Sequence, residues 1–302
     1  MAIIHINSCP VCGSEKFTPF RSCKDNLVSD ETFTVFLCSK CQFAFTQDFP
    51  DENVIGKYYD APEYVSHSDT QKGIINTLYH LARKIALNFK ANIIKKASGK
   101  QSGTILDIGS GTGYFMHRIK NDGWDITGIE KSVSAREYAK LKFGLNLSEP
   151  ESLFQIPEKT KDVVTLWHVL EHLEKLNDTM QSIHKVLKDD GTAVIALPNK
   201  NSIDAVYYKE HWAAWDVPRH LWHFSPSDFR ELAEKNGFSV VALKPMYLDV
   251  FYISMLSEKN RKLPLASLIG LIKGGIFFLR SLTGVEKCSS IIYILKKIKT
   301  ND

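Results

Sequence analysis

One stretch near the middle of the chain decides the fold: Thr104-Ile105-Leu106-Asp107-Ile108-Gly109-Ser110-Gly111-Thr112-Gly113. Its first five residues form a short apolar run typical of a buried strand, and a helical pattern begins directly after the glycines. Glycines let a ligand approach the backbone closely, and the first turn of a helix presents unpaired N–H groups. Glu130 follows the next predicted strand, where a carboxylate can accept hydrogen bonds from both hydroxyls of a ribose. These residues predict a nucleoside cofactor bound at a turn between strand and helix.

The spacing of the glycines indicates the kind of cofactor. The pattern is G-x-G-x-G, without the third-glycine spacing of a dinucleotide fingerprint, and Asp107 would be unfavourable next to a pyrophosphate. A cofactor with a cationic or zwitterionic end fits better, although glycines also form plain turns that bind nothing. The expected cofactor-binding residues are Asp107, Gly109, Ser110, Gly111, Gly113, Glu130 and, at the end of a later strand, Trp167.

Strands and helices alternate around this turn, which predicts a parallel α/β sheet with helices on both faces. The predicted strands are 104–108, 124–129, 162–166, 192–197, 238–244 and 290–295. The predicted helices are 70–98, 114–121, 132–143, 174–188 and 229–236, and residues 249–284 are expected to be mostly helical. In the first of them, apolar residues recur at three- and four-residue steps and mark one face of an amphipathic helix: Ile74, Ile75, Leu78, Leu81, Ile85, Phe89 and Ile93.

With these motifs, the chain resembles the class I S-adenosylmethionine-dependent methyltransferases. Leu106–Gly113 resembles the first motif of that family, Asp162–Leu173 its fourth-strand motif and the following helix, and Val186–Gly191 the turn before its fifth strand. The resemblance implies a seven-stranded Rossmann-like sheet whose seventh strand runs antiparallel between the fifth and the sixth. It also implies S-adenosylmethionine as the cofactor and methyl transfer by direct displacement.

Three histidines are candidates for a general base: His168, His220 and His223. His168, Glu171 and His172 have the spacing of one helix face. Ubiquinone-pathway and small-RNA methyltransferases resemble this stretch and hold a divalent ion with Glu-x-x-Glu-His. His168 replaces the first of those glutamates, which argues against magnesium and leaves a catalytic metal open.

A dense aromatic and histidine segment follows the predicted strand 192–197, from His211 to Pro226. Its tryptophans are expected to form an apolar wall near the cofactor, and Arg219 could bind a phosphate or a carboxylate. A packed loop without chemistry is the alternative for this segment. Ser225-Pro226-Ser227-Asp228 has the sequence of a helix N-cap.

Two cysteine knuckles near the start predict a small zinc ribbon. Cys9-x2-Cys12 and Cys38-x2-Cys41 supply the four thiolates of a tetrahedral structural zinc site, although the spacing alone would also suit iron. An N-terminal ribbon before a methyltransferase pattern resembles the deoxysugar C-methyltransferases and certain ribosomal-RNA guanine methyltransferases. The sequence shows no further domain like the one that the sugar enzymes often carry.

The balance of charge bears on the acceptor. The chain has 302 residues and a net charge of +4, and residues 99–256 carry 18 basic and 21 acidic side chains. That balance argues against a nucleic-acid partner. We therefore expect a small-molecule or sugar-like acceptor, with rRNA or tRNA methylation and a non-catalytic S-adenosylmethionine-binding adaptor as alternatives.

The excess positive charge lies at the end of the chain, where residues 257–302 carry nine basic and three acidic side chains. The basic helical segment there has three interpretations: a solvated surface, a cover over the substrate site, or peripheral contact with an anionic membrane. MAIIHINSCP has no secretory pattern, so we expect a cytoplasmic protein. The expected domains are a zinc ribbon over 1–48, a linker and amphipathic helix over 49–98, and a methyltransferase domain over 99–302 with a helical insertion at 249–284.

Overall fold

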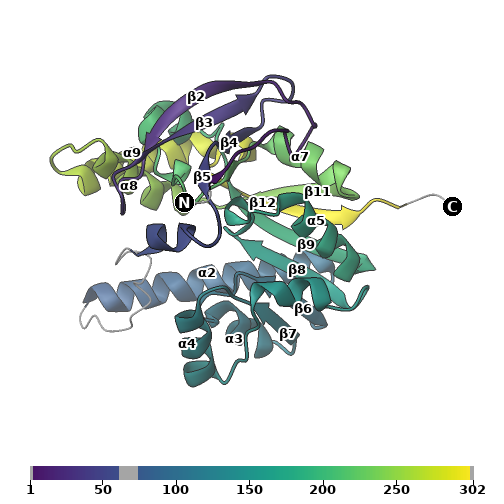
Figure 1. The fold of residues 1–302 in the computed structure, drawn as a ribbon. Helices are drawn as coiled ribbons and strands as arrows, with labels where there is room; N and C mark the ends of the chain where they lie inside the picture. Colours follow the sequence, from purple (N-terminus) through teal and green to yellow (C-terminus); the bar gives the residue numbers. More distant parts are fainter. Residues whose placement is uncertain (1–2, 61–73, 300–302) are drawn as a thin grey trace.

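The computed structural model describes residues 3–60 and 74–299, and a mixed β-sheet lies at its centre (Figure 1). Within these residues the sheet has six strands in the order β11-β12-β9-β8-β6-β7. The strands are β6 (Thr104–Ile108), β7 (Asp125–Ile129), β8 (Lys161–Trp167), β9 (Leu187–Pro198), β11 (Phe238–Pro245) and β12 (Ser290–Lys297). β12 runs antiparallel between β9 and β11, which confirms that part of the expected topology.

The described sheet has six of the seven strands that the family resemblance implies, and the one it lacks is the strand expected beyond β7. Where it would lie beyond β7, Ser148 forms an isolated parallel bridge with Ile129. Its N–H donates to the Gly128 carbonyl and its own carbonyl accepts from the N–H of Glu130. Pro150 follows and starts a short 3-10 helix, η2 (Pro150–Gln155). Proline has no N–H to donate to a ladder, so the pairing ends after one residue.

Helices cover both faces of the sheet. One face is packed by α2 (Ile74–Ser98), α3 (Tyr114–Lys120) and α4 (Val133–Phe143), and the other by α5 (Leu176–Val186) and α7 (Pro226–Lys235). α7 begins with the predicted cap, because the Ser225 hydroxyl accepts from the N–H of Asp228 and the Asp228 carboxylate accepts from the N–H of Ser225.

The buried side of α2 differs from the predicted one. Ala91 and Ile94 pack against the sheet, whereas Ile85 and Phe89, which the apolar pattern placed on the buried face, are exposed. Residues 70–73 and the side chains of Ile74, Ile75, Leu78 and Leu81 lie outside the described part of the chain.

The N-terminal segment, residues 3–50, is a small β-structure that we call the ribbon. It contains β1 (Ile3–Ile4), β2 (Phe17–Lys24), β3 (Thr32–Cys38), β4 (Ala44–Thr46) and β5 (Phe49–Pro50). A short strand from the distant aromatic segment, β10 (Trp222–His223), pairs with β4. The ribbon sheet therefore has the order β10-β4-β3-β2 and includes a strand from the segment between β9 and β11 of the central sheet. Phe43 and Phe45 of the ribbon belong to the same buried cluster as the central sheet.

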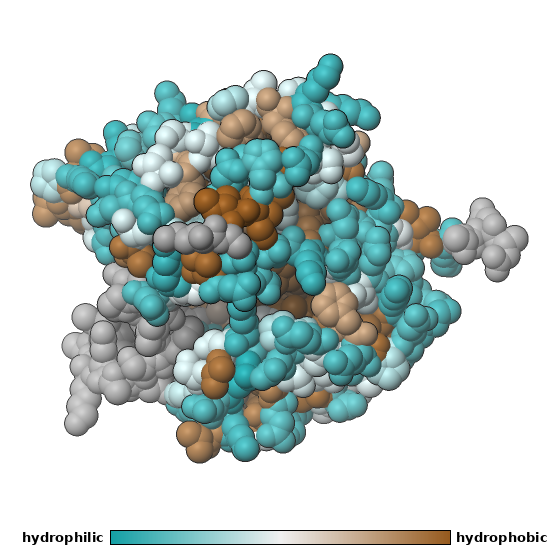
Figure 2. Space-filling view, viewed as in Figure 1, coloured by the Kyte–Doolittle hydropathy of each residue, from teal (hydrophilic) through white to brown (hydrophobic). Residues whose placement is uncertain are grey.

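Two helices inserted between β11 and β12 form what we call the α8–α9 hairpin: α8 (Asp249–Asn260) and α9 (Ala266–Ser281). They lie beside the ribbon at the upper left of Figure 1. In the same part of Figure 2, apolar side chains reach the surface among hydrophilic ones. Among the helices in the described residues, none combines the length and the apolarity needed to span a bilayer.

Candidate active site

The glycine turn joins β6 to α3 at the carboxyl edge of the sheet, and we call residues 109–113 the cofactor turn. Its backbone is tied to the neighbouring strand, because the N–H groups of Gly109 and Ser110 both donate to the Ile129 carbonyl at 2.8 and 2.9 Å. Gly109 has a φ of 76°, and a Cβ there would lie 2.3 Å from Val169 Cγ2. Only glycine fits this position, because both the backbone conformation and the close approach of the segment after β8 exclude a side chain.

Glu130 lies beside the turn, where the ribose hydroxyls of a nucleoside are expected. Its carboxylate accepts from the N–H of Gly111 at 2.7 Å and from the N–H of Ser132 at 2.8 Å. These two bonds hold both carboxylate oxygens at the edge of the cofactor turn. The geometry therefore brings the predicted glycines and Glu130 together.

Asp107 is fully buried beneath the turn. Its Oδ1 accepts from the Thr165 hydroxyl at 2.6 Å. Burial raises the pKa of Asp107 to about 6, against the opposing effects of the Thr165 hydrogen bond and the charge of Lys90. The carboxylate is therefore charged at neutral pH and provides the negative potential that a cationic cofactor would need.

Lys90 on α2 is a functional candidate that the sequence analysis missed. Its Nζ lies 4.6 Å from the centroid of the Trp167 ring. Burial lowers the pKa of Lys90, and the charges of Asp107 and Asp249 partly oppose that effect. The sequence feature that could have identified Lys90 is its spacing, three residues after Leu87 and four before Ile94, which places it on the side of α2 that packs inward.

His168 follows β8 and has a φ of 57°, a conformation that costs energy for a non-glycine residue and is concentrated at functional sites. Its Nε2 lies 3.1 Å from Asp249 Oδ2 and its Nδ1 lies 3.3 Å from Glu171 Oε1. Burial opposes protonation, but the two carboxylates outweigh it and raise the pKa of His168 to about 10. His168 is therefore a cation at neutral pH in this arrangement.

Glu171 lies at the centre of a group that we call the histidine–glutamate cluster: His168, Glu171, His172 and His220. Ligand atoms of Glu171, His172 and His220 all lie within 4.8 Å of one another. Glu171 has no exposed surface, and neither of its carboxylate oxygens accepts a well-aligned hydrogen bond from the described residues. An unsatisfied buried carboxylate is costly. The cluster therefore has the character of a site for a cation or for a hydroxyl donor.

The two histidines beside Glu171 have fixed tautomers. His172 Nδ1 lies 3.0 Å from the Arg219 carbonyl oxygen, and His220 Nδ1 lies 2.9 Å from that of Ala214. A carbonyl only accepts, so each Nδ1 carries a proton, and in a neutral ring the lone pair would be on Nε2. Burial, and then the charge of His220, lower the pKa of His172 to about 4. Tyr59 Oη also lies 3.1 Å from His172 Nδ1.

The spacing of His168, Glu171 and His172 predicted a helix face, and that expectation is wrong. Leu170–His172 is a 3-10 turn, η3, and α5 begins only at Leu176. The three side chains meet because the chain turns back sharply after β8, not because they share an α-helical stripe. His220 reaches the same place from the aromatic segment.

His223, the third candidate base, lies apart from this group. It belongs to β10, its Nε2 is 3.0 Å from the Thr46 hydroxyl oxygen, and its ring stacks edge-on against Trp215. Burial lowers the pKa of His223 well below its usual value. These contacts give His223 a place in the packing between the ribbon and the central domain.

Arg219 and the tryptophans also have different surroundings from those expected. Arg219 is buried, and its guanidinium donates to Asp25 of the ribbon at 2.9 Å, to Asp216 at 2.7 Å and to the Tyr58 carbonyl at 2.8 Å. Trp212 and Trp215 are almost fully buried in a cluster between ribbon, hairpin and α6 (Ile203–Tyr208). They therefore join structural units and do not line an open site.

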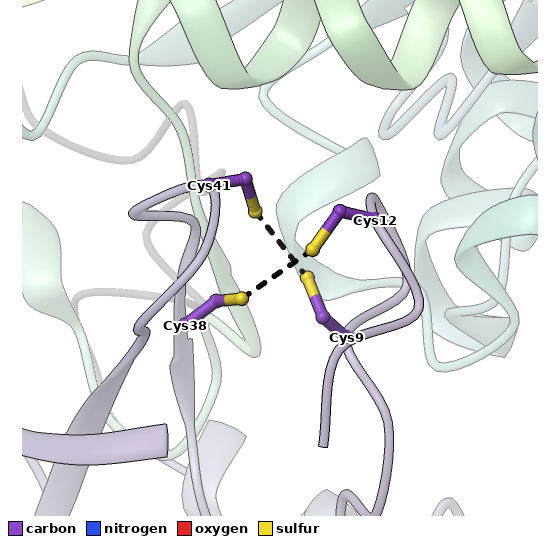
Figure 3. A group of neighbouring side chains, drawn as sticks. All are labelled: Cys9, Cys12, Cys38 and Cys41. Atoms are coloured by element: carbon purple, nitrogen blue, oxygen red, sulfur yellow. Dashed lines mark hydrogen bonds between the residues drawn. The ribbon is translucent and has the colours of Figure 1, made fainter. Parts of the chain in front are cut away.

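The four knuckle cysteines converge on one point, as Figure 3 shows. The Sγ atoms of Cys9 and Cys41 are 3.6 Å apart, and those of Cys12 and Cys38 are 3.5 Å apart. A tetrahedral zinc–thiolate site with bonds of ~2.3 Å has sulfur–sulfur distances of about 3.8 Å. The two knuckles also match in backbone, since the N–H of Gly13 donates to the Cys9 carbonyl and that of Gln42 to the Cys38 carbonyl. The donor set and its spacing are compatible with a zinc site.

Comparisons with known proteins agree with this architecture. A family described as "Methyltransferase domain" matches residues 79–243, a range that begins after the cysteine knuckles. A ubiquinone biosynthesis O-methyltransferase of Rickettsia bellii is 28% identical over 203 residues, covering 62% of this chain and 83% of the relative. The protein of the same name from Pelagibacter ubique is 28% identical over 180 residues, covering 53% and 74%.

Among solved structures, a complex of the Haloferax volcanii Trm112 methyltransferase activator with a methyltransferase is similar to this chain. It has a TM-score of 0.51 at 14% identity, and the match covers 73% of this chain and 95% of the other. At that identity the likeness shows the fold.

Proposed function

This chain belongs to the methyltransferase domain family and is an S-adenosylmethionine-dependent enzyme, and we propose that it methylates a hydroxyl group of a small molecule at the histidine–glutamate cluster. The observation that carries this proposal is the buried Glu171, whose carboxylate oxygens accept no well-aligned hydrogen bond from the described residues. A hydroxyl acceptor would supply the donor that this carboxylate lacks. The names of the two relatives, ubiquinone biosynthesis O-methyltransferases, agree with such an acceptor.

The cofactor roles follow from charge and geometry. Glu130 would accept hydrogen bonds from the ribose hydroxyls, and the glycines would let the cofactor approach the backbone. Lys90 would bind the carboxylate of the methionine part, and Asp107 would attract its cationic groups. Trp167 lies at the end of β8 between Lys90 and Phe115 and would form an apolar wall beside them.

Methyl transfer is a direct displacement. A bond forms between the acceptor oxygen and the methyl carbon, the carbon–sulfur bond breaks with its electron pair going to sulfur, and the hydroxyl proton must leave. We propose His168 as the group that takes this proton, in the state in which a ligand bound at Glu171 offsets the charge of that carboxylate and leaves the imidazole neutral. His168 directly follows β8. The next residue, Val169, lies against Gly109 of the cofactor turn, and η3 begins at Leu170.

The histidine–glutamate cluster also fits a divalent cation. Glu171 and the Nε2 atoms of His172 and His220 would hold it, and each histidine has its other nitrogen fixed by a carbonyl, as metal-binding histidines usually have. A nitrogen-rich set favours a transition metal over magnesium. Such a cation would lower the pKa of a bound hydroxyl. With Glu171 compensated in this way, His168 would retain only Asp249, an Asp–His arrangement suited to accepting a proton.

A second ion, zinc, is proposed for the four cysteines, with a structural role. The two proposed metal sites are separable by variants. Glu171→Gln should remove one metal equivalent and leave the cysteine-bound zinc, as measured by atomic emission on the purified full chain. If Glu171→Gln left the metal content unchanged while Cys38→Ser removed all metal, the cluster would not hold an ion.

The acceptor class can be tested with labelled cofactor. Full-length protein is incubated with methyl-labelled S-adenosylmethionine and either a set of phenols, catechols and sugars or total RNA. We expect label in a small-molecule product, and His168→Gln should lower that transfer by ~10²–10⁴-fold while cofactor affinity measured by calorimetry stays the same. His211→Gln, at an exposed position, is the matched control. Label in RNA would overturn the small-molecule proposal, and cofactor binding without transfer to any fraction would favour the adaptor.

A further inference from the structure

The α8–α9 hairpin presents an apolar stripe for which the proposed methyl transfer has no use. Five aliphatic side chains of this segment are exposed at three- and four-residue steps: Leu265, Leu268, Ile272, Ile276 and Leu279. Between 51% and 73% of each side chain remains accessible. Residues with this spacing lie above one another on one face of a helix. The stripe therefore runs along the whole length of α9 and is continuous.

Glycines explain why this face points outward. Gly270 and Gly274 lie on the opposite side of α9 and face α8, where an added Cβ would come within 2.4 Å of Met255 Cα and within 3.0 Å of Phe251 Cα. The two helices therefore pack backbone to backbone along small residues, with Phe277 completing the buried side. The large aliphatic residues of α9 contribute nothing to that contact. Packing against α8 therefore does not explain why these residues are apolar, and a contiguous exposed apolar surface of this kind marks an interaction site.

The charges around the stripe are almost all positive. Lys259, Arg261, Lys262 and Arg280 are exposed on the hairpin and the loop between its helices, and no acidic residue occurs between 259 and 285. Glu258, the acidic residue just before this range, is buried and accepts a hydrogen bond from Lys273 at 2.6 Å. Beyond α9 the exposed Glu286 and Lys287 carry opposite charges. An apolar face flanked by lysine and arginine is the pattern of helices that lie in a membrane interface.

We propose that the α8–α9 hairpin docks on the surface of an anionic lipid membrane, with the stripe of α9 inserted among the acyl chains. A helix of 16 residues is about 24 Å long, shorter than the ~30 Å hydrocarbon core, so α9 would lie in the interface and not cross it. The lysines and arginines flanking the stripe would contact the lipid phosphates.

Two features favour lipid over another protein as the occupant. The stripe is the convex outer side of a helix and not a groove, which suits insertion into fluid acyl chains. A second copy of the chain packed on the same stripe by two-fold symmetry would bring one set of basic residues toward another. Anionic lipid headgroups complement this charge, whereas self-association opposes it.

Vesicle flotation of the full-length protein tests this proposal. We expect the protein to float with phosphatidylcholine vesicles that contain phosphatidylglycerol and to stay in solution with pure phosphatidylcholine. The double variant Ile272→Glu/Leu279→Glu should reduce the bound fraction at least ~10-fold, because two charges would have to enter the apolar layer. Leu141→Glu on α4, where the leucine is 89% exposed, is the matched control and should float like the wild type.

Cofactor binding by calorimetry shows whether each variant is folded. Flotation that is unchanged by Ile272→Glu/Leu279→Glu in a folded protein would overturn the proposal. So would a concentration-dependent dimer, measured by light scattering, that this double variant abolishes in a protein that never floats. Neither result depends on whether the acceptor of the methyl group is a small molecule.

Discussion

The cofactor turn takes its residues from one continuous piece of chain, whereas the histidine–glutamate cluster takes them from segments far apart in sequence. Asp107, the glycines and Glu130 belong to one strand, one turn and the next strand. His168, Glu171 and His172 follow β8, His220 comes from the aromatic segment, and their neighbours Tyr59 and Asp249 come from two further segments. A local motif therefore determines the first site, and tertiary structure determines the second.

The ribbon takes part in only one of these two sites. The N–H of Leu221 donates to the Glu171 carbonyl, and the Leu221 carbonyl accepts from the N–H of Thr46 in β4. The Thr46 hydroxyl donates to the His220 carbonyl at 2.8 Å. The segment that carries His220 is thus held between η3 and the ribbon. We expect damage to the ribbon to disturb the cluster and to spare the cofactor turn.

Removing the proposed zinc should have the largest effect on the histidine–glutamate cluster while leaving the cofactor turn intact. Cys38→Ser should release zinc and unfold the ribbon, because structural zinc sites supply most of the stability of such small units. Methyl transfer should then fall by at least ~100-fold, the effect of losing the group that moves the proton. Calorimetry should show cofactor affinity preserved within about threefold, that is, within ~0.7 kcal/mol.

The control for that experiment is Cys23→Ala, which alters a buried ribbon cysteine outside the four-thiolate group. It should keep both zinc and activity. If Cys38→Ser weakened cofactor binding as strongly as it weakened methyl transfer, the two sites would not be separable.

The contact between Arg219 and Asp25 tests the same coupling without removing metal. Burial raises the pKa of Asp25, but the guanidinium of Arg219 and nearby N–H groups outweigh this effect and keep the pKa below its usual value. Arg219→Met would leave Asp25 charged and buried, and we expect a loss of about 3–5 kcal/mol in the free energy of unfolding. Urea denaturation followed by tryptophan fluorescence measures it.

Arg280→Met, at an exposed position on α9, should change the free energy of unfolding by less than about 0.5 kcal/mol. An equally small effect of Arg219→Met would show that the ribbon is held by its apolar contacts alone.

The same contrast explains what could be predicted from the sequence. Short apolar runs bounded by turns predicted the strands of the central sheet to within two residues, with one exception. β9 begins at Leu187, five residues before its predicted start, so most of the Val186–Gly191 stretch that was expected to be a turn is strand. Ser225 with Asp228 formed the expected helix cap. Local patterns are reliable there because strand, turn and cap depend on neighbouring residues. The strand expected beyond β7 was another exception, since Pro150 stops a pairing that the family resemblance implied.

The cluster could be predicted only in part. His168 and His220 were candidates, but no local pattern shows that His220 lies next to Glu171 or that Arg219 is engaged by Asp25. Those contacts form when β10 joins the ribbon sheet, which is a long-range pairing. His223 lies only three residues from His220 in the same segment, yet its side chain contacts Thr46 in the packing interface with the ribbon.

Lys90 on α2 tests whether a residue outside the stretch from Asp107 to Glu130 contributes to cofactor binding. Lys90→Met keeps most of the length of the side chain and removes the charged group that we expect to meet the cofactor carboxylate. Affinity for S-adenosylmethionine, measured by calorimetry, should fall about 10-fold, which corresponds to one charge-assisted hydrogen bond of ~1.4 kcal/mol. The control is Lys96→Met, on the exposed side of the same helix. Unchanged affinity in Lys90→Met would leave the cofactor site confined to residues 107–130.

The smallest expected effect concerns the pH dependence of cofactor binding. Because burial raises the pKa of Asp107 to about 6, protonation competes with cofactor binding as the pH falls through that value. Between pH 7 and pH 5.5 the charged fraction of such a group drops about fourfold, so the dissociation constant should rise by about the same factor. The amino group of the cofactor, an α-amine with a pKa near ~7.8, stays mostly protonated over this range and adds little. Asp107→Asn should bind more weakly at pH 7 and show no such rise, because it has no proton to gain. A rise of equal size in Asp107→Asn would assign the pH dependence to another group, and the charge beneath the cofactor turn would then have no part in recognising the cofactor.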